Sequence, residues 1–137
     1  MSTKKETAAP IEAEPVVDEQ EYEIAVKEAE NSPNAYTHEF PTPFSFEGES
    51  FDKLSFDFGT LTAQDSLSIE AELQATGRPV IVPEFSGDYL LRMAMRACTT
   101  RKSNGMKLGL DFFQKLPLSA YVKIRGKARS FLLRAGS

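Results

Sequence analysis

Two short stretches near the middle of the chain alternate apolar and polar side chains, and they constrain the fold more than any other feature. Residues 44–46 (FSF) and 54–58 (LSFDF) have the two-residue period of a half-buried β-strand. Between them lies the sequence EGE, in which Gly48 can adopt the positive φ that a tight reversal needs. The pattern predicts a β-hairpin with one aromatic face. Because an isolated hairpin is not stable in water, other elements must cover that face.

The predicted hairpin is not regular along its whole length. Phe51 is out of step with Leu54, which indicates a bulge or a longer loop near residues 52–53. Pro41 and Pro43 have no amide hydrogen to donate to a sheet, so the first strand is expected at an edge.

A helix is predicted directly after the hairpin. Thr62 and Asp65 have the spacing of a capping box, so the helix should begin there and run to about Thr76, with Gly77 ending it. Residues 78–85 (RPVIVPEF) are apolar and extended, and their two prolines are expected to exclude a helix. This segment is either a short edge strand or a buried connector.

Three further helices are predicted in the second half. The second helix of the domain is capped by Ser86 or Asp88 and broken by residues 103–105 (SNG), the third covers residues 111–116, and the last begins at Pro117 and runs to about Leu133. The inner face of the last helix is expected to contain Tyr121, Ile124, Ala128, Phe131 and Leu132.

The predicted fold class is therefore α+β, an N-terminal hairpin packed against about four helices in a small domain over residues 36–137. Residues 1–35 are expected to be a disordered acidic extension, because they contain few large apolar side chains to offset the entropy cost of ordering. Within it, residues 18–30 have one helical stripe of apolar side chains, Tyr22, Ala25, Val26 and Ala29. This short helix either frays in solvent or folds against a basic partner surface.

The net charge of −4 conceals a strong asymmetry along the chain. Residues 1–72 contain 4 Lys, no Arg and 17 acidic residues, a balance of −13, whereas residues 73–137 contain 12 basic and 3 acidic residues, a balance of +9. Either the two halves neutralise each other in the fold, or each faces a different charged partner.

Residue types suited to catalysis are scarce. His38 is the one imidazole and is interpreted as a surface or packing residue, and Cys98 is interpreted as a small buried hydrophobe of the second helix. The sequence contains no Cys/His cluster, calcium loop, nucleotide-binding loop or long apolar run. No enzyme activity, metal, cofactor or membrane span is therefore expected, and the protein is expected to be cytoplasmic.

Basic residues gather on two of the predicted helices, where phosphate binding is the obvious interpretation. Arg92 and Arg96 share one flank of the second helix, and the last helix carries Lys123, Arg125, Lys127, Arg129 and Arg134. Their i, i+4 pairing is typical of the solvent side of a helix with one buried stripe, and no aromatic platform for bases interleaves with them. A solvated surface, or pairing with the acidic half or with a protein partner, is favoured over nucleic acid.

Several motifs follow one another in a distinctive order. They are residues 40–48 (FPTPFSFEG), 61–65 (LTAQD), the Ala- and Arg-containing helix near residues 89–98, and 112–117 (FFQKLP), followed by a basic terminal helix. In this order they resemble the tail assembly chaperones of long-tailed bacteriophages, with their P-x-x-F-x-G, L-T-x-x-D and F-F-x-x-L-P segments. The likeness covers residues 38–134 and leaves out the acidic extension.

The resemblance implies a non-enzymatic chaperone that binds and solubilises the tape measure protein, a very long helical chain, and helps recruit the tail tube protein. It implies action in the host bacterial cytoplasm and absence from the mature virion, with a longer frameshifted form of the same protein as a further partner. Two alternatives stay open: a nucleic-acid-binding regulator with an acidic shielding tail, and a minor structural tail component. The oligomeric state is not predicted.

Candidate partner-binding residues lie in the second half of the chain. They are Phe112, Phe113, Leu116 and Tyr121, flanked by Arg92 and Arg96. Core packing of the aromatic residues is favoured over an interface, so only an exposed part of this cluster is the candidate client groove.

Overall fold

The computed structural model describes residues 19–20, 23 and 34–136. The elements of residues 34–136 follow in the order β1 (Ala35–Phe46), β2 (Glu49–Asp57), η1 (Phe58–Thr60), α2 (Ala63–Ala75), η2 (Pro83–Phe85), α3 (Gly87–Ala97), α4 (Leu110–Gln114) and α5 (Leu118–Ala135). This confirms the α+β class. Glu19, Gln20 and Glu23 are helical. The expected disordered extension was drawn one residue too long, because Ala35 already belongs to β1 and pairs with Asp57. The other residues of the extension before Asn34, and of the helix over residues 18–30, lie outside the described residues.

The predicted hairpin is formed by β1 and β2, which pair antiparallel. Glu47 and Gly48 make the turn with φ of 51° and 81°, and Phe46 pairs with Glu49 across it. Positive φ at both turn residues matches the right-handed twist of the strands. The turn thus needs the left-handed conformation at Glu47 as well as at the predicted glycine.

The hairpin is irregular at the level of Asp52, and the extra residues lie on β1, not on β2. Glu39 pairs with Lys53 and Phe44 pairs with Phe51, so residues 40–43 of β1 face Asp52 alone. The prediction of a bulge near Asp52 was right about the position along the hairpin and wrong about the strand. Residues 40–43 include two prolines, which cannot donate to the ladder, and this explains why β1 carries the extra length.

Helix α2 begins and ends as predicted. The Asp65 carboxylate accepts a hydrogen bond from the backbone amide of Thr62 at 2.8 Å. At the other end, Gly77 has a φ of 79°, and the amide of Arg78 donates to the carbonyl of Leu73 at 3.0 Å. These are the bonds of a glycine-terminated helix, which satisfy carbonyls that would otherwise lack donors.

The connector between α2 and α3 differs from both alternatives for residues 78–85. Ile81 is 89% exposed, and the segment forms no strand. Pro83–Phe85 form the single turn η2, with Pro83 at its start, where the missing amide hydrogen is not needed. The expectation that prolines exclude any helix here was therefore wrong.

Helix α3 begins as predicted but ends early. The Ser86 side chain caps it by accepting from the amide of Tyr89 at 3.1 Å. The helix stops at Ala97, not at residues 103–105, because the chain there joins the free edge of β2: the amide of Thr99 donates to the carbonyl of Ser55 at 2.8 Å.

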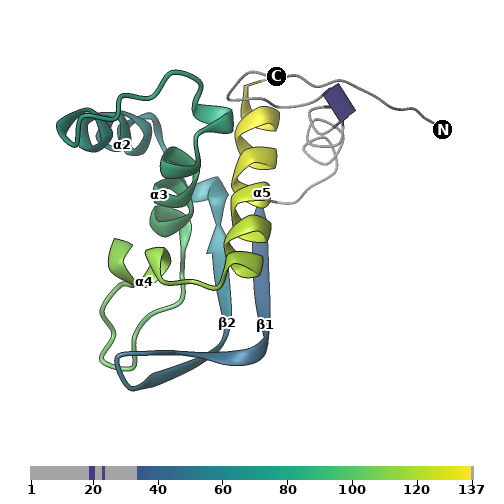
Figure 1. The fold of residues 1–137 in the computed structure, drawn as a ribbon, viewed down its shortest axis with the longest axis vertical. Helices are drawn as coiled ribbons and strands as arrows, with labels where there is room; N and C mark the ends of the chain where they lie inside the picture. Colours follow the sequence, from purple (N-terminus) through teal and green to yellow (C-terminus); the bar gives the residue numbers. More distant parts are fainter. Residues whose placement is uncertain (1–18, 21–22, 24–33, 137) are drawn as a thin grey trace.

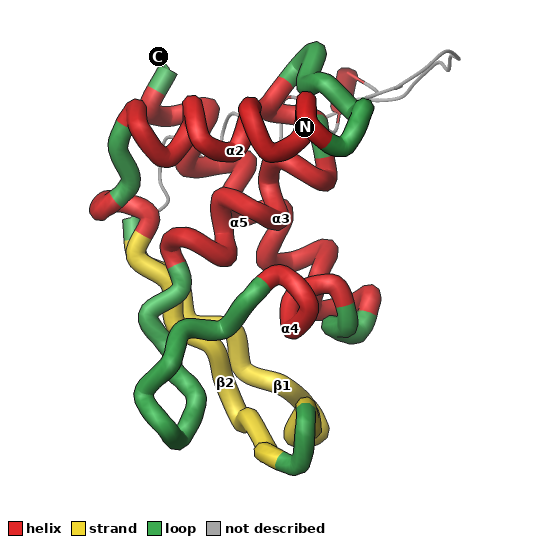
Figure 2. Tube along the Cα trace, turned by 90° about the vertical axis from the view of Figure 1, so that its left-hand side faces the viewer, coloured by secondary structure: helices red, strands yellow, loops and turns green. Residues whose placement is uncertain are grey.

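The helices form a layer over the hairpin, with α3 between α2 and α5 (Figure 1). The turn of the hairpin extends beyond the helices (Figure 2). The loop after α3 contacts this turn: Lys102 lies 3.7 Å from the Glu47 carboxylate, and the amide of Ser103 donates to the Glu49 carboxylate at 2.8 Å.

Candidate partner-binding surface

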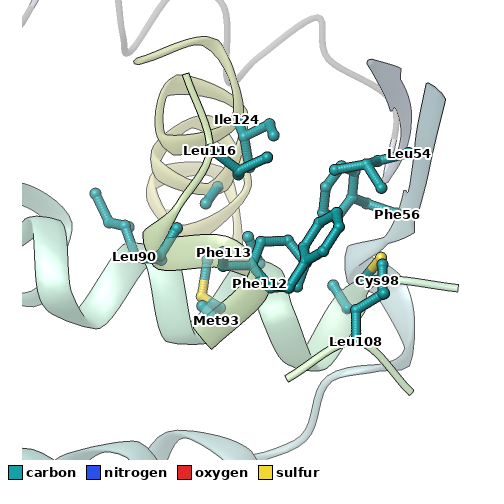
Figure 3. Packing of buried hydrophobic residues seen from close by; sticks show 14 of the residues in the cluster. Leu54, Phe56, Leu90, Met93, Cys98, Leu108, Phe112, Phe113, Leu116 and Ile124 are labelled. Atoms are coloured by element: carbon teal, nitrogen blue, oxygen red, sulfur yellow. The ribbon is translucent and has the colours of Figure 1, made fainter. Parts of the chain in front are cut away.

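The two phenylalanines of α4 are core residues. Phe112 is fully buried and Phe113 is 1% exposed. The Phe112 ring meets the rings of Phe46 and Phe51 edge-on, at centroid distances of 5.2 and 5.0 Å. Figure 3 shows both phenylalanines between α3 and the hairpin residues Leu54 and Phe56. α4 thereby covers the aromatic face of the hairpin, whose exposure to water would be unfavourable.

The other apolar candidates are also covered to a large extent. Leu116 is 9% exposed, and Tyr121 is partly buried. The Tyr121 hydroxyl occupies the space that a Cβ at Gly87, in the first turn of α3, would need, and the Arg125 guanidinium lies 5.2 Å from the centre of the Tyr121 ring. Because Phe112, Phe113 and Leu116 are buried, this cluster does not form the exposed groove that was a candidate for client binding.

Arg92 and Arg96 face α2, not solvent. Arg92 donates to the Glu72 carboxylate at 2.9 Å, and Arg96 donates to the same carboxylate at 2.9 Å. Arg96 also donates to Asp65 at 3.1 Å. The acidic and basic halves of the chain thus neutralise each other at this helix interface.

The ion pairs shift the pKa values of their members. Burial alone would raise the pKa of Glu72, but hydrogen bonds from Arg96 and Arg92 outweigh it, so the pKa lies below its ordinary value. For Asp65, the hydrogen bond from the Thr62 backbone is the largest cause of a lowered pKa, with Arg96 adding to it. Both carboxylates are therefore ionised throughout the neutral range.

His38 and Cys98 are packing residues. His38 is 4% exposed, its Nδ1 lies 3.1 Å from the Tyr36 hydroxyl, and burial, followed by the charge of Lys123, lowers its pKa. Burial raises the pKa of the Cys98 thiol. A neutral imidazole and a protonated thiol match the interpretation of both residues from the sequence.

The basic residues of α5 were expected to face solvent, but not all of them do. Arg129 is 8% exposed, its Nε donates to the carbonyl of Glu84 at 3.0 Å, and its guanidinium lies 4.9 Å from the centre of the Phe85 ring. The prediction of a solvated face was wrong for this residue, because η2 packs against α5 and needs a donor for its carbonyl. Lys123 is exposed as predicted.

The first turns of α5 carry an exposed apolar pair. Leu118 is 73% exposed and Val122 is 43% exposed, and their i, i+4 spacing places them on one stripe. The inner side of α5 carries Ala120, Ile124 and Ala128. Sequence reasoning missed this pair, although two apolar residues opposite the buried stripe are a readable signal.

Among the described residues, no group of three or more His, Cys, Asp or Glu side chains is arranged to hold a metal ion. No helix described by the structure is long and apolar enough to cross a bilayer. Comparisons of the chain with protein-family models, curated proteins and solved structures found no match.

Proposed function

We propose that this protein is a non-enzymatic tail assembly chaperone of a bacteriophage. It binds and solubilises the tape measure protein in the host cytoplasm, helps recruit tail tube subunits and is absent from the mature virion. A longer frameshifted form of the chain is a proposed further partner.

The order of the motifs carries this proposal. Residues 40–48 run into the hairpin turn, residues 61–65 enclose the start of α2, and residues 112–117 run from within α4 to the residue before α5. Segments that resemble one family therefore lie in succession at the ends of elements and share one core. Such agreement between local signals and packing is typical of a sequence that specifies one fold, and it supports the treatment of these motifs as parts of one unit.

The client surface that fits this function is the exposed pair on α5. A tape measure protein presents amphipathic helices, whose apolar faces bind exposed apolar side chains flanked by polar ones. Leu118 and Val122 offer such a contact, with Lys115 and Lys123 exposed at their ends. The lysines would keep the free chaperone soluble.

Co-expression with the tape measure protein tests the proposal. We expect the chaperone to raise the soluble fraction of its client, and the double variant L118S/V122S to lose most of this effect. The matched control is L67S, which changes a leucine that is 60% exposed on α2. No gain in client solubility with the natural sequence would reject the function, and equal losses in both variants would reject the surface.

Two measurements address the alternatives. A structural tail component would be detected by mass spectrometry of purified virions, whereas the proposed chaperone would be absent. A nucleic-acid-binding regulator would bind DNA in a salt-dependent manner. The use of Arg92, Arg96 and Arg129 within the fold speaks against that role, since these cations already have partners.

A further inference from the structure

One flank of α5 carries basic residues that follow the edge strand β1. Lys123, Lys127 and Arg134 are spaced by four and seven residues, which places them on one helical stripe. Lys127 lies 5.5 Å from the centre of the Tyr36 ring, and Arg134 donates to the side-chain carbonyl of Asn34. The stripe therefore runs along β1 in the opposite direction. We call these three residues the α5 basic row.

Aromatic rings lie beneath the basic row. Tyr36, Phe56, Phe58 and Phe131 stack in succession, at centroid distances of 6.0, 6.0 and 5.6 Å. The two end rings, Tyr36 and Phe131, are only partly buried. The flank thus combines positive charge with accessible aromatic surface, which suits an acidic amphipathic segment.

The chain itself supplies such a segment close by. Residues 18–30 (DEQEYEIAVKEAE) contain six acidic residues and one Lys, a balance of −5, and the apolar stripe of Tyr22, Ala25, Val26 and Ala29. They precede Asn34, which Arg134 holds at the end of the basic row. Glu19, Gln20 and Glu23 are helical and exposed.

The dimensions agree with a docked segment. At about 1.5 Å per residue, a helix over residues 18–30 is about 20 Å long, and the basic row from Lys123 to Arg134 is about 17 Å long. The linker of residues 31–33 spans at most about 10 Å, enough for the chain to turn back along α5.

We propose that residues 18–30 dock on the α5 basic row of the same chain, with the apolar stripe on the partly buried rings and the carboxylates beside the cations. The contact shields the row from other polyanions, and it does not depend on the proposed chaperone function.

Paramagnetic relaxation in the full-length protein tests this contact. A spin label at E23C is used, because the native Cys98 is buried and burial raises the pKa of its thiol, so an exposed new cysteine reacts first. We expect strong broadening of the amide signals of residues 123–134 at low salt, little broadening of α2, and loss of the effect in 1 M salt, where the screening length is about 3 Å. Equal broadening of α2 and α5, or none, rejects the proposal.

Charge variants and a mixing experiment complete the test. K123E/K127E should abolish the broadening, whereas K53E/K107E, with the same charge change at two other exposed lysines, should leave it. A dispersed spectrum for each variant shows that the fold is intact. Broadening in a mixture of spin-labelled protein with isotope-labelled, unmodified protein would assign the contact to a second copy and overturn the intramolecular docking.

Discussion

Arg96 of α3 and Glu72 of α2 form a charged hydrogen bond, with 2.9 Å between Nη2 and Oε2. This bond joins the basic half of the chain to the acidic half. Arg92 donates to the other oxygen of the same carboxylate, also at 2.9 Å. One carboxylate between two guanidinium groups therefore positions α2 against α3, although α2 buries only Ile69 and Leu73 fully.

Removing the charge of Glu72 should destabilise the protein. We expect E72Q to lower the free energy of unfolding by about 1 kcal/mol, because the bonds are charge-assisted but the carboxylate is partly exposed. The control is E70Q, an exposed glutamate on the same helix, with an expected change within about 0.5 kcal/mol. Urea unfolding of both variants measures the difference, and equal effects would show that α2 is not held by this bond.

Truncation of Phe112 should be among the most costly changes in the chain. F112A should destabilise by about 3–5 kcal/mol, since a buried ring leaves a cavity. F112L should cost less, but it still loses edge-on contacts with Phe46 and Phe51, each worth about 0.5–1.5 kcal/mol. Thermal denaturation measures both variants. A melting temperature for F112A close to that of the natural protein would contradict the packing described.

Gly87 and Tyr121 should show strong coupling. A Cβ at Gly87 would overlap the Tyr121 hydroxyl, so G87A must displace that ring. In a Y121F background the hydroxyl is gone, and G87A should become neutral or stabilising by up to about 1 kcal/mol, because alanine favours helices. A double-mutant cycle of unfolding free energies measures the coupling. Additive effects of the two changes would exclude the contact.

His38 should make the protein less stable in mild acid. Burial, followed by the Lys123 charge, lowers its pKa from the ordinary 6.5, so the unfolded chain takes up a proton that the folded chain resists. The stability contribution is complete above pH 6.5 and is lost as the pH falls from there towards the folded pKa. We expect H38L to flatten the stability profile in this window, measured by urea unfolding at a series of pH values.

The carboxylates of α2 provide an internal reference for this experiment. Asp65 and Glu72 have lowered pKa values, so their contribution is present above their ordinary values of 3.8 and 4.5 and is lost as the pH falls through the folded values. H38L should retain this second loss. If the stability of H38L fell between pH 7 and 5 by as much as that of the natural protein, the imidazole would not be responsible for the first loss.

Short-range patterns in the sequence were sufficient for much of the fold. The hairpin turn at Gly48 and both ends of α2 follow from interactions between residues a few positions apart, such as the bond from the Thr62 amide to Asp65. Such signals can be read directly, because backbone geometry and capping depend on local residue types. The burial of Ile124 and Ala128 on α5 follows equally from helical periodicity.

The candidate site depended more on distant contacts. The sequence identified Phe112, Phe113 and Leu116 as an apolar cluster, but only the hairpin packed above Phe112 shows that it is core. Leu118 and Val122 became the candidate surface because the structure leaves both exposed on one face of α5. An apolar residue has the same chemistry at both kinds of position, so its neighbours decide its role.

The sequence by itself determined the hairpin, the start and end of α2, the cap of α3 and the opposite charges of the two halves. The tertiary structure decided which strand carries the extra residues of the hairpin, that α3 ends where Thr99 meets Ser55, 44 residues away, and that Arg129 turns inward to the Glu84 carbonyl, 45 residues away. Periodicity and capping describe neighbours along the chain. The hydrogen-bond partners of a strand edge or of a buried cation depend on how distant segments pack. A buried polar group must be hydrogen-bonded, and the fold decides which distant group is near enough to bond with it.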